Sequence, residues 1–379
     1  MSRDRRRGLP RIALVHDWLT GMRGGEKVLE ALCELYPEAP VFTMVHVPGT
    51  ESRTIARHHP RGAWLSRLPG VGRYYRHLLP LFPLAAETFD LDEFDLVISS
   101  SHCAVKSIVR PGRARHLSYC HTPMRYVWDQ RDAYFGPERL GRAGSRALRP
   151  VLAWLARWDA ATAGRVDRYL ANSQHVARRI HRYYNRRAEV VAPPVDTGFF
   201  HPDGRLPGDF ALAVSALAPY KRLDVAIEGC RLAGIPLRIV GWGPEERRLR
   251  AQARGGAELL GTLSDEEIRE LYRSCAMVLL PGEEDFGIVP VEAQACGRPV
   301  VAAAAGGALE TVVDGTTGVL VAPGSAEALA EGIRRVRATR FDEAVLRRHA
   351  EAFGRERFKA RISAIVDETL ASGASPTTW

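Results

Sequence analysis

The sequence has no apolar run that approaches the length of a transmembrane helix, and no hydrophobic segment typical of a signal peptide. Its six cysteines are scattered, without the paired spacing of a zinc site or a disulfide framework. We therefore expect buried, reduced thiols in a cytoplasmic protein. No G-x-G-x-x-G pattern follows the first predicted strand, which disfavours a dehydrogenase.

Length and charge set the broad class. The chain has 379 residues, too many for one typical core, so we expect two domains. Lys and Arg number 53 against 44 Asp and Glu, a net charge of +9. A basic surface attracts anions such as nucleotide diphosphates, acidic lipids or nucleic acid, and charge alone does not choose among them.

Strand-like and helix-like segments alternate in both halves of the chain. Strands are predicted over residues 11–17, 40–46, 94–100, 116–120, 168–171, 210–217, 237–240, 258–260, 276–280 and 299–303. Helices are predicted over 26–36, 145–165, 223–232, 245–253, 288–296 and 326–338, with Ser173, Ser264 and Ser325 opening helices as caps.

This alternation predicts an α/β protein with two doubly wound parallel sheets. We expect an N-terminal domain over residues 1–195 and a C-terminal domain over 203–344, joined by a linker over 193–202. Ligands of such sheets bind outside the carboxyl ends of the strands. With two such domains, the expected site is a cleft between them.

Two glutamates flank the predicted start of one helix. The apolar run 276–280 predicts a buried strand, and residues 288–296 have a helical pattern. Glu284 therefore lies in a strand-to-helix turn, and Glu292 lies about one turn into the helix. Two carboxylates at this spacing suit the hydroxyl groups of a sugar and of a ribose.

The start of the same helix suits an anion. The backbone N–H groups of Phe286, Gly287 and Ile288 lie where unpaired donors and the positive end of the helix dipole favour a phosphate. The pattern fits a nucleotide sugar whose diphosphate lies between Glu284 and Glu292. The alternative is a solvated acidic turn before an ordinary helix.

A basic pair follows the first strand of the second half. Pro219 breaks the run, so Lys221 and Arg222 lie in the loop at the carboxyl end of that strand. Two cations there suit a diphosphate leaving group, on which negative charge grows as the glycosidic bond breaks. The alternative is a solvated helix start, although a cation at that end opposes the helix dipole.

Three further positions in the first half follow strands. Gly24 and Gly25 lie between the first strand and the first helix, where backbone can closely approach a diphosphate, or where a plain turn is needed. His121 follows the strand 116–120 and suits a contact with a sugar hydroxyl, although a histidine at a strand end is more often structural. His16, Asp17 and His102 also sit at strand ends and are weaker candidates.

Residues 61–87 mix aromatic and aliphatic side chains with arginines. Such a mixture is typical of a membrane interface with anionic lipid. A helical insertion packed on its own domain explains the same pattern equally well.

These motifs together resemble the group 1 (family 4) retaining glycosyltransferases, which have the GT-B fold of two Rossmann-like domains. Glu284 and Glu292 match the E-x7-E motif of that family, and Gly24 and Gly25 match its first-loop glycines. Residues 15–27 and 119–126 are similar to a subgroup described as bacterial O-antigen or exopolysaccharide mannosyltransferases. The resemblance extends over residues 11–340.

The resemblance implies a role for each matching residue. Glu284 is implied to contact the donor sugar, Glu292 the ribose, and His121 the region of the anomeric carbon. Lys221 matches the family's lysine, but Ala216 stands where many members carry an arginine, and Arg222 is the candidate replacement. A C-terminal helix, here expected over 345–369, returns to the first domain.

The implied reaction retains anomeric configuration and uses neither a metal nor a cofactor. A hexose, with GDP-mannose as the favoured donor and glucosyl or N-acetylglucosaminyl donors as alternatives, is transferred to a glycan or lipid-linked acceptor. The expected location is the cytoplasm, at the inner face of the plasma membrane, with a peripheral contact to anionic lipid and no nucleic-acid partner. A sugar-nucleotide epimerase, another GT-B enzyme such as a phosphorylase, and a basic scaffold for membrane or nucleic acid are the alternatives.

Overall fold

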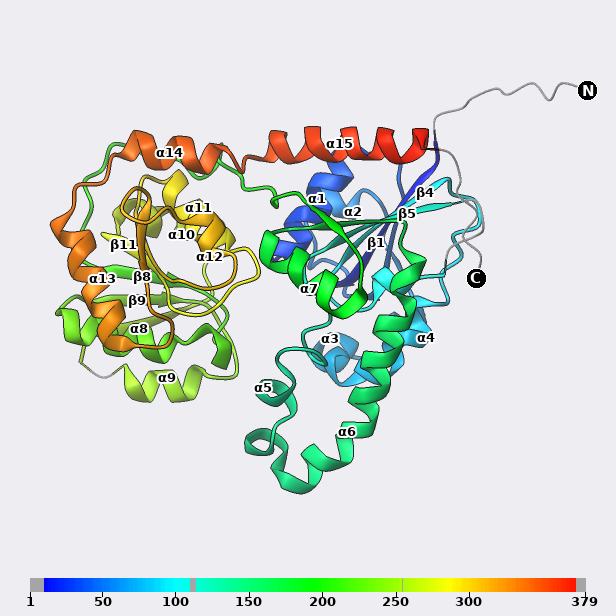
Figure 1. Cartoon of the computed structure of the whole chain (residues 1–379), viewed down its shortest axis with the longest axis horizontal. Helices are drawn as coiled ribbons and strands as arrows, with labels where there is room; N and C mark the ends of the chain where they lie inside the picture. The colour runs from blue at the N-terminus through cyan, green and yellow to red at the C-terminus, as the bar shows by residue number, and fades with distance from the viewer. Residues whose placement is uncertain (1–9, 110–113, 254, 373–379) are drawn as a thin grey trace, which may run out of the picture. The chain divides into compact units, whose positions relative to one another are not determined.

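The computed structural model describes residues 10–109, 114–253 and 255–372. The chain forms two compact units (Figure 1). Unit 1 comprises Met1–Val191 and Lys359–Trp379, and unit 2 comprises Ala192–Phe358. Among the described residues, no helix is long and apolar enough to cross a membrane. All six cysteines are buried and free, as expected.

Unit 1 contains a parallel sheet with the strand order β3-β2-β1-β4-β5-β6-β7. The strands are β1 (Ile12–Leu19), β2 (Val41–His46), β3 (Arg61–Gly62), β4 (Leu96–Ser101), β5 (Arg115–Cys120), β6 (Arg168–Ala171) and β7 (Ala188–Val190). The helices are α1 (Gly24–Leu35), α2 (Arg53–Ala56), α3 (Val71–Tyr74), α4 (Phe82–Ala86), α5 (Arg131–Phe135), α6 (Pro137–Ala161) and α7 (Gln174–Tyr184).

Unit 2 contains a second parallel sheet with the order β10-β9-β8-β11-β12-β13. Its strands are β8 (Ala211–Val214), β9 (Leu237–Val240), β10 (Ala257–Gly261), β11 (Met277–Leu280), β12 (Val300–Ala303) and β13 (Gly318–Val321). Its helices are α8 (Leu223–Ala233), α9 (Glu246–Gln252), α10 (Asp265–Ser274), α11 (Ile288–Ala295), α12 (Ala308–Thr311), α13 (Ala326–Ala338) and α14 (Glu343–Glu351).

Both sheets have the doubly wound topology that the sequence predicts. The strand order reverses between β1 and β4 in unit 1 and between β8 and β11 in unit 2. In open parallel sheets, ligands bind at such switch points, outside the carboxyl ends of the strands. The predicted α/β fold class is therefore confirmed.

Local signals placed most helix starts correctly. The side chain of Ser173 accepts the N–H of Val176 at 3.0 Å, and Ser325 accepts that of Ala328 at 3.0 Å. Ser264 and Glu267 form a reciprocal capping box, with distances of 2.8 and 3.2 Å. The strands β3 and β7 were not predicted, because two or three residues carry too little periodicity, and the four-residue strand β13 was also missed.

Three segments differ from the expectations. The predicted linker 193–202 contributes Val195 and Phe200 to the core of unit 2, with 1% and 2% of their surfaces exposed. The single helix expected over 345–369 is broken at Gly354 into α14 and α15 (Arg355–Ala371). Helix α1 begins at Gly24, two residues earlier than predicted.

The segment 61–87 packs mainly on unit 1. It folds into short helical turns, and its side chains Leu65, Tyr75, Leu79 and Phe82 lie in the core. This burial favours the alternative of a packed insertion over a membrane-facing segment. Leu84 is the most exposed of its apolar side chains, at 58%.

Helix α15 belongs to unit 1 from Lys359 onward. Ile362 and Ile365 are fully buried there. The Lys359 ammonium lies 3.4 Å from the carboxylate of Glu34, and the Arg168 guanidinium lies 2.8 Å from that of Glu368. The last helix therefore closes the core of the first unit.

Candidate functional site

In unit 2, the loops after β8 and β11 bring Lys221 and Glu284 together. The two strands are parallel neighbours, so their carboxyl ends meet at one edge of the sheet. The Lys221 Nζ forms an ion pair with Glu284 Oε1, and the two side chains are 14% and 19% exposed. The sequence singled out both residues for the same site, but not their direct pairing.

A glycine makes this close approach possible. A Cβ atom at Gly282 would lie 2.5 Å from the carbonyl oxygen of Tyr220 and 2.7 Å from the Cα of Lys221. Such distances do not occur in real structures, so a larger residue at 282 must push the two loops apart. The glycine that ends β11 therefore sets the position of Lys221.

A third loop, after β12, supports the Glu284 turn. The N–H of Gly307 donates to the carbonyl oxygen of Glu284 at 2.8 Å. A Cβ at Gly306 would lie 2.3 Å from the same oxygen, so backbone packs directly on backbone. Three neighbouring strands thus fix the orientation of the Glu284 segment.

The start of α11 lies immediately after this turn. Gly287 has φ = 92°, a left-handed conformation that favours glycine, and Ile288 is the first helical residue. The ring of Phe286 is only 4% exposed and packs on Phe353, with 5.6 Å between ring centroids. What Phe286 can offer a ligand is therefore its backbone.

Glu292 lies one turn into α11 and is 7% exposed. The hydroxyl of Tyr272, on α10, donates to Glu292 Oε2 at 3.0 Å. Burial, and then the neighbouring carboxylate, hold the pKa of Tyr272 well above its usual value, so the phenol remains a donor. No sequence signal pointed to Tyr272, which lies 20 residues before its partner.

Arg222 does not join the pair formed by Lys221 and Glu284. It adopts φ = 50° at the start of α8, and its Nε and Nη2 atoms lie 3.2 and 3.3 Å from the two carboxylate oxygens of Asp224. Its side chain is 43% exposed. Whether it contacts a phosphate stays a prediction.

In unit 1, Gly24 and Gly25 form the first turn of α1. A Cβ at Gly25 would lie 3.5 Å from Cε1 of His16, 3.8 Å from Nε2 of His121 and 3.9 Å from Nδ1 of His102. His16 lies within β1, contrary to its expected place at a strand end, whereas His102 and His121 directly follow β4 and β5, and the topology brings all three around one glycine. Of these, only His121 was a leading candidate from the sequence.

A hydrogen-bonded chain connects two of these histidines. His16 Nδ1 lies 3.1 Å from Oγ of Ser100, which lies 2.8 Å from Nε2 of His121. The other nitrogen of His16 lies 3.9 Å from Oε1 of Glu26. Burial raises the pKa of Glu26, but the interactions of its carboxylate with His16, His102 and Arg23 lower it by more. The net effect is a lowered pKa.

If the carboxylate of Glu26 selects the Nε2–H form of His16, the chain has one consistent direction. Ser100 then donates to His16 and accepts from Nε2–H of His121. Ser100 and Glu26 therefore position His121, and sequence reasoning missed both.

Asp17 organises the loop that carries His102. Its buried carboxylate accepts the backbone N–H groups of residues 102, 103, 104 and 105, at 2.6, 2.9, 2.7 and 3.0 Å. It also lies 3.3 Å from Nδ1 of His102. Burial, reinforced by His16, lowers the pKa of His102 to about 3, so this imidazole is neutral near pH 7.

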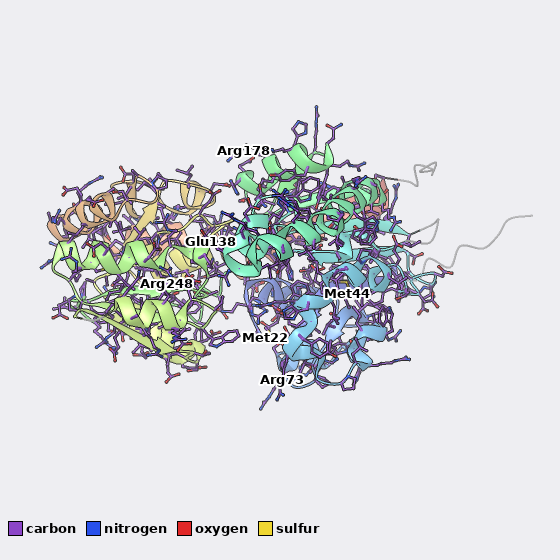
Figure 2. The ribbon with its side chains drawn as sticks, turned by 90° about the horizontal axis from the view of Figure 1, so that it is seen from below. Met22, Met44, Arg73, Glu138, Arg178 and Arg248 are labelled. Atoms are coloured by element: carbon purple, nitrogen blue, oxygen red, sulfur yellow. The ribbon has the colours of Figure 1, made fainter. Side chains whose placement is uncertain are left out.

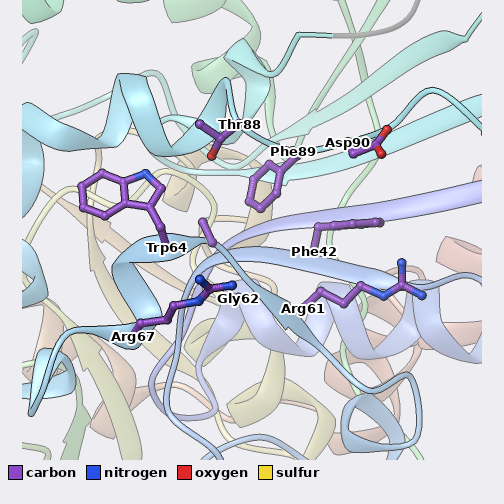
Figure 3. A pocket seen from close by; sticks show the side chains of 9 residues that line it. Phe42, Arg61, Gly62, Trp64, Arg67, Thr88, Phe89 and Asp90 are labelled. Atoms are coloured by element: carbon purple, nitrogen blue, oxygen red, sulfur yellow. The ribbon is translucent and has the colours of Figure 1, made fainter.

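One hollow in unit 1 lies apart from these residues. It measures about 310 Å³ and is lined by side chains that include Phe42, Trp64, Arg67 and Phe89 (Figure 3). It contains none of the predicted site residues. In the described parts of the chain, no group of three or more His, Cys, Asp or Glu side chains is arranged to hold a metal ion.

Comparisons with known proteins agree with this architecture. Residues 22–199 match the model of Glycosyltransferase Family 4, and residues 203–356 match that of Glycosyl transferases group 1. The D-inositol 3-phosphate glycosyltransferase of Geodermatophilus obscurus is 36% identical over 225 residues, 50% of each chain. That of Mycolicibacterium smegmatis is 34% identical over 181 residues, 41% of this chain and 42% of its own. The match thus spans about half of the length of these two curated relatives, or slightly less.

Two solved structures share the fold over almost the whole chain. Anabaena HepE in complex with UDP has a TM-score of 0.66 and 22% identity, covering 96% of this chain and 100% of its own. Sucrose-phosphate synthase from Thermosynechococcus elongatus has a TM-score of 0.68 and 18% identity, covering 96% and 100%. Since the two family models between them match nearly all of residues 22–356, and both units have the expected sheets, the chain belongs to the group 1 (family 4) glycosyltransferases.

Proposed function

We propose that this chain is a hexosyltransferase that moves a sugar from a nucleotide-diphosphate donor to a hydroxyl of a glycan or lipid-linked acceptor. The proposed reaction retains the anomeric configuration, needs no metal, and serves cell-surface polysaccharide synthesis at the cytoplasmic face of the membrane. The observation that carries the proposal is the pairing of Lys221 with Glu284 at the switch point of unit 2, directly before α11.

The ion pair explains how one site serves both parts of the donor. An arriving diphosphate offers Lys221 a stronger anionic partner than Glu284, and the first amides of α11 add N–H donors. Glu284, released from Lys221, then accepts hydrogen bonds from sugar hydroxyls. As the glycosidic bond breaks, Lys221 stabilises the negative charge that develops on the departing diphosphate.

The acceptor hydroxyl must lose a proton during transfer. In the proposed front-face reaction, an oxygen of the leaving phosphate takes that proton. The bond from the anomeric carbon to the phosphate oxygen breaks while the bond to the acceptor oxygen forms on the same face. No separate protein base is then needed.

Glu292 is proposed to bind the ribose. A carboxylate offers about four lone-pair positions, and the hydroxyl of Tyr272 uses one of them. A buried carboxylate that accepts several hydrogen bonds suits the two adjacent hydroxyls of a ribose. Tyr272 fixes the carboxylate before the donor arrives, which lowers the entropy lost on binding.

The N-terminal domain, residues 1–195, is proposed to be the acceptor-side domain, with the C-terminal helix packed on it. Gly24 and Gly25 leave room for close approach at the first turn of α1, and His121 is proposed to contact the transferred sugar. The domain proposed to bind the donor covers residues 203–344.

The identity of the donor is the least constrained part. The resemblance to mannosyltransferases favours GDP-mannose, while the two curated relatives named above are D-inositol 3-phosphate glycosyltransferases and HepE was solved with UDP. Thermal shift with GDP-mannose, UDP-glucose, UDP-N-acetylglucosamine and ADP-glucose separates these, because a ligand that binds the folded form raises the Tm.

A charge-matched pair of variants tests the site. Glu284→Gln should abolish transfer, whereas Glu283→Gln, the same change at the exposed neighbour in the same loop, should retain it. Products are read by mass spectrometry after adding donor and acceptor glycans. Transfer by Glu284→Gln at the wild-type rate would contradict the proposal, and an isomerised nucleotide sugar formed without acceptor would identify an epimerase instead.

A further inference from the structure

Helix α6 presents a face that its packing does not use. Leu152 and Leu155 are buried in the core of unit 1, and Leu148 and Val151 pack beside them. Near its end, the buried carboxylate of Asp159 lies 3.0 Å from Nζ of Lys106. These contacts anchor α6 by its inner side, while in Figure 1 its first half extends away from the sheet of unit 1.

The opposite side of α6 is basic. Arg142, Arg146, Arg149 and Arg157 are all exposed. At 100° per residue they fall within roughly 80° of arc around the helix axis. We call these four residues the α6 basic face.

Apolar side chains lie directly beside this face. Ala143, Ala147, Pro150 and Trp154 follow the adjacent line of the helix, and Trp154 is 46% exposed. Leu140, just before the kink at Gly141, is 45% exposed. An exposed tryptophan beside a row of arginines is the composition of a surface that lies at lipid headgroups.

Arg142, Arg146 and Arg149 lack the acidic neighbours that several arginines have on another helix of this chain, α9. The sequence has no Asp or Glu between Glu138 and Asp159. Among the described residues, none forms an ion pair with Arg142, Arg146 or Arg149. By contrast, Arg250 on α9 pairs with Glu246 at 2.9 Å, and Arg248 pairs with Glu245 at 2.6 Å. Figure 2 labels Arg248 on α9 and Glu138 at the start of α6.

Such a row is unfavourable for the isolated helix. Arg142 and Arg146 are four residues apart and Arg146 and Arg149 three apart, spacings at which like charges repel. Arg142 also lies near the N-terminal end of the helix, where the dipole disfavours a cation. An external anionic surface would offset both effects.

We propose that the α6 basic face docks unit 1 on a bilayer that contains anionic phospholipid, with Trp154 inserted at the level of the headgroups. The arginines contact lipid phosphates, and the apolar line beside them enters the interface. A nucleic acid offers the same phosphates, but it gives no reason for the exposed Trp154 and Leu140. The proposal assigns the membrane contact to α6, since most apolar side chains of 61–87 are buried.

The test is binding to vesicles, which requires neither donor nor acceptor. Each basic residue near an anionic bilayer strengthens partitioning roughly fivefold. Substituting Arg142→Gln, Arg146→Gln and Arg149→Gln together should therefore weaken partitioning to phosphatidylglycerol-containing vesicles on the order of 100-fold. Trp154→Ala should weaken it further while leaving its salt dependence unchanged.

The control removes the same charge elsewhere. Arg247, Arg337 and Arg340 are exposed on unit 2 and form no ion pair with a described residue, so their triple Gln variant should bind vesicles as the wild type does. Circular dichroism melts confirm that each variant is folded. The proposal is wrong if wild type binds neutral and anionic vesicles equally, if both triple variants lose binding alike, or if the α6 variant loses affinity for duplex DNA but not for vesicles. Because no turnover is measured, failure here leaves the proposed transferase activity untouched.

Discussion

Replacing Gly25 by alanine separates a functional glycine from a structural one. The residue occupies the second position of α1 and does not have a positive φ. A Cβ there would meet its nearest neighbours, the three histidine rings, at 3.5 to 3.9 Å, which is ordinary van der Waals contact. The folded structure can therefore accept the methyl group without strain.

The expected change in stability is small and favourable. Alanine restricts the unfolded chain and is the better helix former, which together raise the free energy of unfolding by about 0.4–1 kcal/mol. For a unit of this size that corresponds to a rise in Tm of about 1–4 °C.

The expected change in function is large. The methyl group fills the space among His16, His102 and His121, which the proposed function needs for close approach of a ligand to backbone. Because misplacement by about 1 Å can cost on the order of 100-fold in rate, we expect transfer to fall by that amount. The assays are a thermal melt and a transfer assay on the same preparation.

Gly164→Ala provides the control, since a Cβ there meets no atom within 4 Å and its φ is not positive. This variant should keep full transfer activity. If Gly25→Ala transfers sugar as fast as the wild type, Gly24 and Gly25 form a plain strand-to-helix turn. If instead Gly25→Ala unfolds, the three imidazole rings do not leave room for a methyl group at this position.

Three more variants test other contacts. Gly282→Ala should destabilise unit 2 by more than 1 kcal/mol and abolish donor binding, because its Cβ collides with backbone 2.5 Å away; a wild-type melt would contradict this. Tyr272→Phe removes the hydrogen bond that the hydroxyl donates to the charged carboxylate of Glu292 and should cost about 1.5–3 kcal/mol in urea unfolding, an effect that should shrink in a Glu292→Gln background, where the acceptor is uncharged. The pKa of His102 is lowered to about 3, so the unfolded chain takes up a proton that the folded one excludes. The contribution of His102 to the free energy of unfolding should therefore decline by up to about 1.4 kcal/mol per pH unit below pH ~6.5. Urea unfolding of His102→Gln, measured at pH 7.5 and 5.5, should lack that part of the decline.

Much of the fold follows from local information. The alternation of apolar strands with amphipathic helices predicts both sheets, because hydrophobic periodicity is set by residues within a few positions of one another. The caps at Ser173, Ser264 and Ser325 are equally local, since each side chain bonds an amide three residues ahead. For the same reason, the turn that carries Glu284 and the helix that carries Glu292 were placed correctly from the sequence.

Other features depended on neighbours in space. The helical pattern of the sequence continues through Gly354, but the helix is interrupted there. Gly354 instead pairs with Val195 in an isolated bridge. The predicted linker has a fixed place because Phe200 packs in the core of unit 2. Arg222 pairs with Asp224, two residues away, a contact that the sequence analysis did not predict.

The sequence by itself thus determined the type of fold, the motifs and the loops that carry them. Only the tertiary structure decided which loops meet: Lys221 with Glu284, 63 residues apart, and His16 with Ser100, 84 residues apart. The physical reason is the crossover connection of parallel sheets, which places strands side by side that are distant in the chain. Hydrogen bonds and ion pairs between their carboxyl ends therefore leave no periodic trace in the sequence.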